Sequence, residues 1–235
     1  MTTLFSMKPD LQRSATGPGG IFYGVYSALV TDNQDPDNQG RVRIKLLWSP
    51  DTQGEAYELW ARLATSMAGN ERGMWFIPEV DDEVLVAFEA GNPRRPIVVG
   101  SLWNGSDGPP EQMDANNTKK TILSREGVRF TMEDRAGTSK MRLETPNGNT
   151  IVLDDGGRSI TLTDRNGNTV KMDSSGVTVT ASAKVTVNAS TAEVSTGMLK
   201  VSAGMSRFSG VVQCDTLITN SVVSASYTPG AGNIW

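Results

Sequence analysis

The side chains that most often carry out catalysis are scarce in this sequence. Its 235 residues include no histidine and a single cysteine, Cys214. The absence of histidine excludes histidine-based triads, histidine metal sites and imidazole acid–base chemistry. A lone cysteine cannot form a disulfide within one chain, and we expect neither a cofactor nor a transition-metal site.

The acidic residues are the remaining candidates for chemistry. Asp81-Asp82-Glu83 and Asp154-Asp155 are neighbours in sequence, whereas glycoside hydrolysis needs two carboxyl groups facing each other about 5–10 Å apart. The run from Asp164 to Asn168 lacks the full spacing and the closing glutamate of a calcium loop. Gly17 to Gly20 lacks the helix and lysine of a phosphate loop. We therefore expect turn and solvation roles here, and no enzyme activity.

The charge balance disfavours nucleic acid as a partner. Residues 1–118 carry 9 Lys and Arg against 16 Asp and Glu, a net charge of −7, and residues 119–235 carry 13 against 10, a net charge of +3. Binding to a phosphate backbone needs a basic stripe, which neither half has. No stretch approaches ~18 consecutive apolar residues, so we expect no transmembrane helix. The N-terminus lacks a basic patch followed by a long apolar run, so we expect no secretory signal.

The first half of the chain has the pattern of a small antiparallel β-barrel. Arg41 to Leu46 alternates polar and apolar residues, as a half-buried strand does, and Asp35 to Gly40 is strong turn chemistry between two strands. Four tryptophans of this half are expected to give the barrel most of its bulk or to anchor an interface, with ligand stacking as the alternative. They are Trp48, Trp60, Trp75 and Trp103. Strands are predicted at about 21–31, 40–48, 58–66, 73–77, 83–89 and 96–103.

The second half is thin and repetitive. Glycines at 127, 137, 148, 157, 167 and 176 are about ten residues apart, and polar turns separate strands of about five residues. Each predicted strand offers about two inward apolar residues. These residues are Ile151, Leu153, Ile160, Leu162, Val170, Met172, Val177, Val179, Val185 and Val187.

Two apolar residues per strand are too few for a core within one chain. Burying a Val or Leu side chain contributes about 1.5–3 kcal/mol, whereas ordering each backbone residue costs about 1–2 kcal/mol. Intertwined identical chains would place each inward residue against its copies. Residues 176–235 fit such a narrow shaft, since 34 are Val, Ser, Thr or Ala and only 5 are charged. A single-chain β-solenoid is the alternative.

Residues 24–50 have the sequence GVYSALVTDNQDPDNQGRVRIKLLWSP. This segment resembles the opening of the contractile-injection spike family, which includes phage baseplate assembly protein V and the valine–glycine-repeat spikes of type VI secretion. The matching pieces include Val30-Thr31-Asp32-Asn33, Gly40 to Ile44 and Trp48-Ser49-Pro50. The most specific piece runs from Gly73 to Glu89, GMWFIPEVDDEVLVAFE. The resemblance covers residues 21–104 by motif and the rest by composition.

The resemblance implies an all-β chain, with an oligonucleotide/oligosaccharide-binding (OB) type barrel followed by an intertwined trimeric β-helix. The implied parts are an N-terminal arm (1–20), the barrel (21–104), a linker (105–120), a needle (121–226) and an apex segment (227–235). The implied function is a central spike that caps the inner tube at the baseplate and pierces the target envelope when a sheath contracts. The particle would be a phage tail, a tailocin or an extracellular injection system, assembled in the bacterial cytoplasm.

The resemblance also implies partners. We expect a homotrimer, a separate trimeric hub protein at the base of the tube, other baseplate components, and transient contact with the target membrane. The apex carries Pro229, Ile234 and Trp235, which would either cap the needle or dock a tip protein of the proline-alanine-alanine-arginine repeat (PAAR) type. The alternative functions are a nucleic-acid-binding OB-type protein and a trimeric tail-fibre-like adhesin.

Overall fold

The computed structural model describes residues 21–50 and 56–225, and all of its regular elements in this range are strands except one short 3-10 turn. The predicted N-terminal arm and apex segment lie outside the described residues. The chain divides into two units, 1–184 and 185–235, each described by itself below. In the described part, no helix has the length and apolarity needed to cross a membrane.

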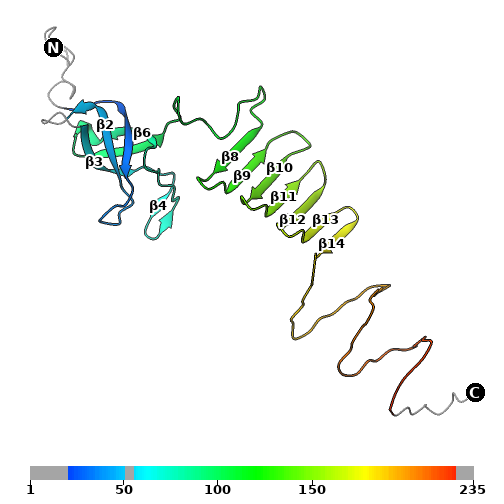
Figure 1. Cartoon of the computed structure of the whole chain (residues 1–235). Helices are drawn as coiled ribbons and strands as arrows, with labels where there is room; N and C mark the ends of the chain where they lie inside the picture. Colours follow the sequence, from blue (N-terminus) through cyan, green and yellow to red (C-terminus); the bar gives the residue numbers. More distant parts are fainter. Residues whose placement is uncertain (1–20, 51–55, 226–235) are drawn as a thin grey trace, which may run out of the picture. The chain divides into compact units, whose positions relative to one another are not determined.

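The N-terminal part of the first unit is a closed five-stranded barrel with the order β1-β2-β3-β7-β6 (Figure 1). A two-stranded hairpin, β4–β5, and the 3-10 turn Glu89–Gly91 lie between barrel strands in sequence. The bounds are β1 Val25–Asp32, β2 Val42–Pro50, β3 Ala56–Leu63, β4 Ala68–Gly69, β5 Arg72–Gly73, β6 Glu83–Phe88 and β7 Pro96–Ser101.

Strand alternation fills the barrel. In β6, Val84, Val86 and Phe88 are buried while the residues between them are half-buried, so the strand has the two covered faces of a closed sheet. The largest fully buried side chains of the barrel are aliphatic, led by Ile44 and Leu46. The barrel is not wholly antiparallel, because β3 pairs with β7 in parallel and thereby closes it. The all-β prediction with an N-terminal barrel is confirmed.

Two details of the barrel prediction are wrong. The strand expected at 73–77 does not form: β5 ends at Gly73, and the residues after it are irregular. The tryptophans do not supply most of the core either. Trp48 packs against it, but Trp75 and Trp103 are 75% and 70% exposed. Apolar character alone did not distinguish a strand from an exposed apolar segment.

The rest of the first unit is a seven-stranded sheet in which consecutive strands pair antiparallel, in the order β14 to β8 (Figure 1). This up-and-down order differs from that of a solenoid, whose coils stack strands of successive turns in parallel. Each strand has five residues, as the ten-residue period predicts. The bounds are β8 Lys119–Leu123, β9 Arg129–Glu133, β10 Lys140–Glu144, β11 Thr150–Asp154, β12 Ser159–Thr163, β13 Thr169–Asp173 and β14 Gly176–Thr180.

The second unit has no strand in its described part, residues 185–225. Its extended chain bends at intervals that shorten from seven residues to five, at Ser190, Gly197, Gly204, Gly210, Asp215, Asn220 and Ala225. Figure 1 shows this segment as a trace, coloured yellow to red, that reverses direction repeatedly without pairing with itself.

Candidate trimerisation site

One face of the seven-stranded sheet is apolar across its width. In a five-residue strand the second and fourth side chains share a face, and the register aligns these positions from strand to strand. One row is Ile122, Phe130, Leu143, Ile151, Leu162, Val170 and Val179. The other row, which begins at Lys120, is Met132, Met141, Leu153, Ile160, Met172 and Val177. We call these two rows the apolar sheet face.

The apolar sheet face is uncovered in the single chain. Ile151, Leu153, Ile160 and Leu162 each leave 39–40% of their surface exposed. A soluble protein seldom exposes a contiguous apolar patch beyond a few hundred Å² unless the patch is an interface. The face is therefore a surface that requires a partner.

The opposite face of the sheet is mostly polar, and several of its charged side chains form ion pairs with one another. Lys140 Nζ lies 2.9 Å from an oxygen of its cross-strand partner Asp154, and Lys171 Nζ lies 2.8 Å from an oxygen of Asp173. Such partly exposed ion pairs contribute little stability individually. They leave this face compatible with water, so the chemistry of the two faces indicates which one is covered.

Eight of the ten predicted core residues share one face of the sheet. Those from Ile151 to Val179 all belong to the apolar sheet face. Val185 and Val187 do not join it, since they follow the last strand and are 63% and 75% exposed. The prediction missed five residues of the same rows: Ile122, Phe130, Met132, Met141 and Leu143. The same alternation in 119–144 would have revealed them.

The start of the sheet is held to the preceding linker by Glu111. Its carboxylate accepts a hydrogen bond from Thr121 Oγ1 at 2.9 Å and pairs with Arg129 and Lys119 on the polar face. The Thr121 hydrogen bond and the two cations lower the pKa of Glu111. The residue thus connects the linker to β8 and β9.

Two of the carboxylates considered for chemistry, Asp154 and Asp164, accept hydrogen bonds within turns. Asp164 accepts hydrogen bonds from the backbone and side-chain nitrogens of both Asn166 and Asn168, which lower its pKa. Asp154 accepts from Gly157 N, which with Lys140 lowers its pKa. Across residues 21–50 and 56–225, no three Cys, Asp or Glu side chains form a group that could hold a metal ion. The predicted turn roles of these two aspartates are confirmed.

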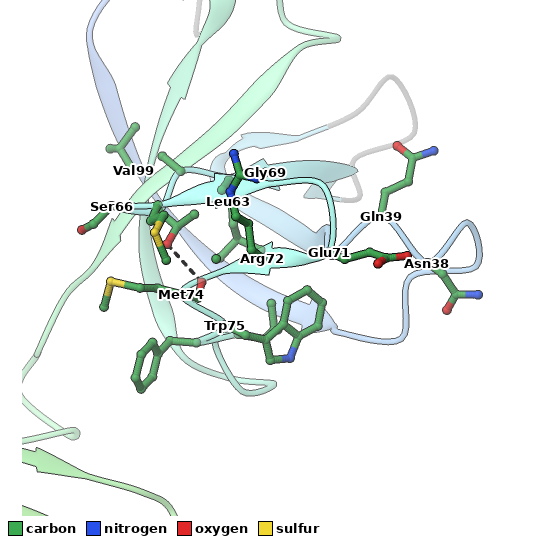
Figure 2. Close-up of a pocket in the computed structure, with 18 residues that line it drawn as sticks. Asn38, Gln39, Leu63, Ser66, Gly69, Glu71, Arg72, Met74, Trp75 and Val99 are labelled. Atoms are coloured by element: carbon green, nitrogen blue, oxygen red, sulfur yellow. Dashed lines mark hydrogen bonds between the residues drawn. The ribbon is translucent and has the colours of Figure 1, made fainter.

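A second exposed apolar surface lies on the barrel. The β4–β5 hairpin and the segment after it border a hollow of about 1100 Å³, and several of the exposed apolar side chains of the barrel line it (Figure 2). We define the hairpin patch as Met67, Met74, Trp75, Phe76 and Val99. The described residues thus include at least two clusters of exposed apolar side chains, the apolar sheet face and the hairpin patch.

Both structured parts match families of known proteins. Residues 26–103 match the type VI secretion system/phage-baseplate injector OB domain. Residues 140–200 match the phage baseplate V C-terminal trimerisation domain, which includes most of the apolar sheet face. The two matches occur in the same order as the barrel and the sheet.

Curated relatives agree with these matches. The type VI secretion system spike protein VgrG1a of Pseudomonas aeruginosa is 31% identical over 53% of this chain and 21% of that protein. VgrG4b of the same organism, also a type VI secretion system spike protein, is 35% identical over 48% of this chain and 13% of its own length. The actin cross-linking toxin VgrG1 of Vibrio cholerae is 33% identical over 46% of this chain and 10% of its own length.

The matched region thus spans about a fifth or less of the length of these relatives. The injector OB barrel, the trimerisation domain and their order agree with the sequence motifs. The chain belongs to the phage baseplate V and type VI secretion spike family.

Proposed function

We propose that three copies of this chain form the structural central spike of a contractile injection machine. The observation that carries the proposal is the apolar sheet face, which is continuous over seven strands and uncovered in one chain. Three such faces meeting around an axis would bury both rows against their copies. The trimerisation-domain match at residues 140–200 supports this number of chains.

The second unit would complete the needle of residues 121–226. Backbone N–H and C=O groups require hydrogen-bond partners when buried, and residues 185–225 form no strand within the chain. Two further copies, winding around the same axis, would supply the missing pairs. The small Val, Ser, Thr and Ala side chains of this region suit the resulting narrow shaft, in which Val185 and Val187 would face the axis.

The role would be mechanical rather than enzymatic. Fully paired, intertwined strands resist separation because pulling one chain away exposes its whole apolar row at once. Elemental analysis that found one iron or zinc ion per trimer, or clearing of peptidoglycan by the pure protein, would contradict this part of the proposal.

The partners follow from position in such a machine. The barrels would attach to a separate trimeric hub protein at the base of the tube, together with other baseplate components, and the needle would touch the target membrane transiently. Pro229, Ile234 and Trp235 would dock a PAAR-type tip protein. Assembly would take place in the bacterial cytoplasm, before the spike becomes part of an extracellular particle or a virion.

Binding of nucleic acid by the barrel has less support. Residues 21–104 carry 7 Lys and Arg against 12 Asp and Glu, a net charge of −5. OB-type barrels that hold single strands combine stacked aromatics with a positively charged groove, and this barrel lacks the charge.

Quantitative mass spectrometry of particles purified through a tag on this chain tests the proposed function. We expect sheath and tube proteins in large excess, with three copies of the chain per particle. A matched preparation carrying a polar substitution on the apolar sheet face, such as Ile160→Asp, should recover no particles. Isolation of the chain with nucleic acid and without sheath or tube proteins would contradict the proposal.

A further inference from the structure

The hairpin patch is a shaped surface and not a loose loop. The hairpin pairs Ala68 with Gly73, and the chain beyond it is fixed by two hydrogen bonds. Met74 N donates to Met67 O at 2.9 Å, and Thr65 Oγ1 donates to Met74 O at 3.1 Å. These bonds hold Met74 and the following residues at the border of the hollow (Figure 2).

Trp75 is largely exposed, but its indole has a fixed position against the backbone of its own chain. Its indole lies over Gly40 in the loop between β1 and β2, so close that a Cβ at residue 40 would be 3.0 Å from the ring. Gly40 has a φ of +71°, a backbone conformation that favours glycine. The absence of a side chain at Gly40 therefore leaves room for a ring that is still 75% exposed. A rigid aromatic side chain loses little entropy on binding, which makes it a good interface anchor.

The size of the patch restricts its partner. Trp75 is 75% exposed and Phe76 is 64% exposed. Together with the three smaller apolar side chains of the patch, they expose roughly a few hundred Å² of apolar surface. A stable complex between free proteins usually buries about 800 Å² on each partner. These five side chains alone therefore fall short of such an interface, whereas a partner that is already held nearby needs less contact area.

Association of three needles would hold such a partner, the barrel of a neighbouring copy, close to the patch. The chain leaves the barrel from β7, which carries Val99 of the patch, and reaches β8 after residues 102–118. This connection spans at most about 60 Å when fully extended. Once three sheets have joined, the other two barrels are present at an effective concentration in the millimolar range.

Charge favours the same partner. The charged residues lining the hollow are Glu71 and Arg72, one of each sign, whereas the barrel as a whole is acidic. Two acidic barrels can therefore approach through this neutral surface without placing like charges opposite each other. A nucleic-acid strand would find one cation here, too few for a phosphate-tracking groove.

We propose that the hairpin patch packs against the barrel of a neighbouring copy, so that the three barrels close into a ring joined patch to neighbour. This inference depends on the trimer but not on the envelope-piercing role. The contact is a second interface in addition to the needle.

Site-specific photo-crosslinking in the full chain tests this contact. Trp75 is replaced by p-benzoylphenylalanine, and the matched control carries the same residue at Tyr23, which is 66% exposed and does not line the hollow. After irradiation we expect covalent dimers and trimers from position 75 and only monomers from position 23 on a denaturing gel. The yield should not change over a hundredfold dilution, because the copies are tethered.

The outcomes separate this inference from the proposed function. A trimer by light scattering that gives no crosslinks at position 75 would overturn the inference alone, whereas a monomer would overturn both. A yield that falls with dilution would assign the contact to separate trimers. A crosslink from position 75 to a different baseplate protein in purified particles, in place of a second copy, would also overturn it.

Discussion

Ile151 of β11 and Leu162 of β12 lie directly opposite each other in the antiparallel register, and each leaves 39% of its surface exposed. Cross-strand pairs of this kind normally stabilise a sheet by being covered as well as paired. Here the pairing is complete and the cover is missing. The sheet thus presents a paired but uncovered apolar surface that is suited to association with further copies.

A charge on the apolar sheet face should disrupt the trimer. Ile160→Asp would place three carboxylates near one axis, where burial without partners costs several kcal/mol per chain. Sedimentation should show a monomer or an aggregate. Thr161→Asp, the next residue of the same strand, points to the polar face and should remain trimeric. Disruption by Thr161→Asp and not by Ile160→Asp would mean that the faces have been assigned in reverse.

Shortening a side chain on this face should weaken the trimer without abolishing it. Ile160→Ala removes buried methyl groups in all three copies, at about 2–5 kcal/mol per site. Chemical denaturation of the full chain should show a lower midpoint for the needle at constant protein concentration. An unchanged midpoint would indicate that this face stays in water.

Removing everything after residue 118 should yield a monomeric barrel. The barrel has its own buried core, whereas the hairpin patch is too small to hold three copies together. Light scattering measures the mass, and circular dichroism checks the fold. A folded trimer formed by residues 1–118 would show that the main interface lies between the barrels and not in the needle.

The loop between β1 and β2 should depend on Asp35. Its carboxylate accepts from the backbone nitrogens of Asp37, Gln39 and Arg41 and pairs with the Arg41 guanidinium, which lowers its pKa. Asp35→Ala should lower the melting temperature of the barrel by several degrees. Asp37→Ala, which removes one exposed contact to Arg41, should have a much smaller effect. Equal effects would show that the turn does not depend on this carboxylate.

Acid should destabilise the sheet through its paired carboxylates. The pKa values of Glu111, Asp154 and Asp164 are lowered in the folded chain from ordinary values of 4.5, 3.8 and 3.8. Their contribution is present above the ordinary values and is lost as the pH falls through the lowered ones. The melting temperature should therefore stay constant from pH 7 to about 5 and decrease below about pH 4. Substituting Asp154→Asn should reduce this decline, and stability that rises below pH 4 would contradict the account.

The apex prediction concerns residues outside the described part of the chain. Deleting residues 228–235 should leave the trimer intact and abolish pull-down of a PAAR-type tip protein. If the deletion instead melts the needle and no tip protein co-purifies, Ile234 and Trp235 form a self-cap.

Local patterns were enough to predict much of the fold. The turn at Asp35 and the alternation in β2 and β6 follow from neighbouring residues, as do the five-residue strands and their two apolar positions. The exposed segment at 74–77 could not be predicted, because strand formation depends on whether a partner strand lies alongside, which a local pattern does not reveal. For the same reason, the contact between Trp75 and Gly40 could not be predicted, because Gly40 lies in a loop 35 residues earlier in the chain.

The mass of the full-length chain in dilute solution tests the central claim most directly. Multi-angle light scattering at micromolar concentration should give three times the chain mass of 25.2 kDa, unchanged on dilution. A particle of 25.2 kDa that melts cooperatively would contradict the account, because the apolar sheet face would then be stable in water without a partner.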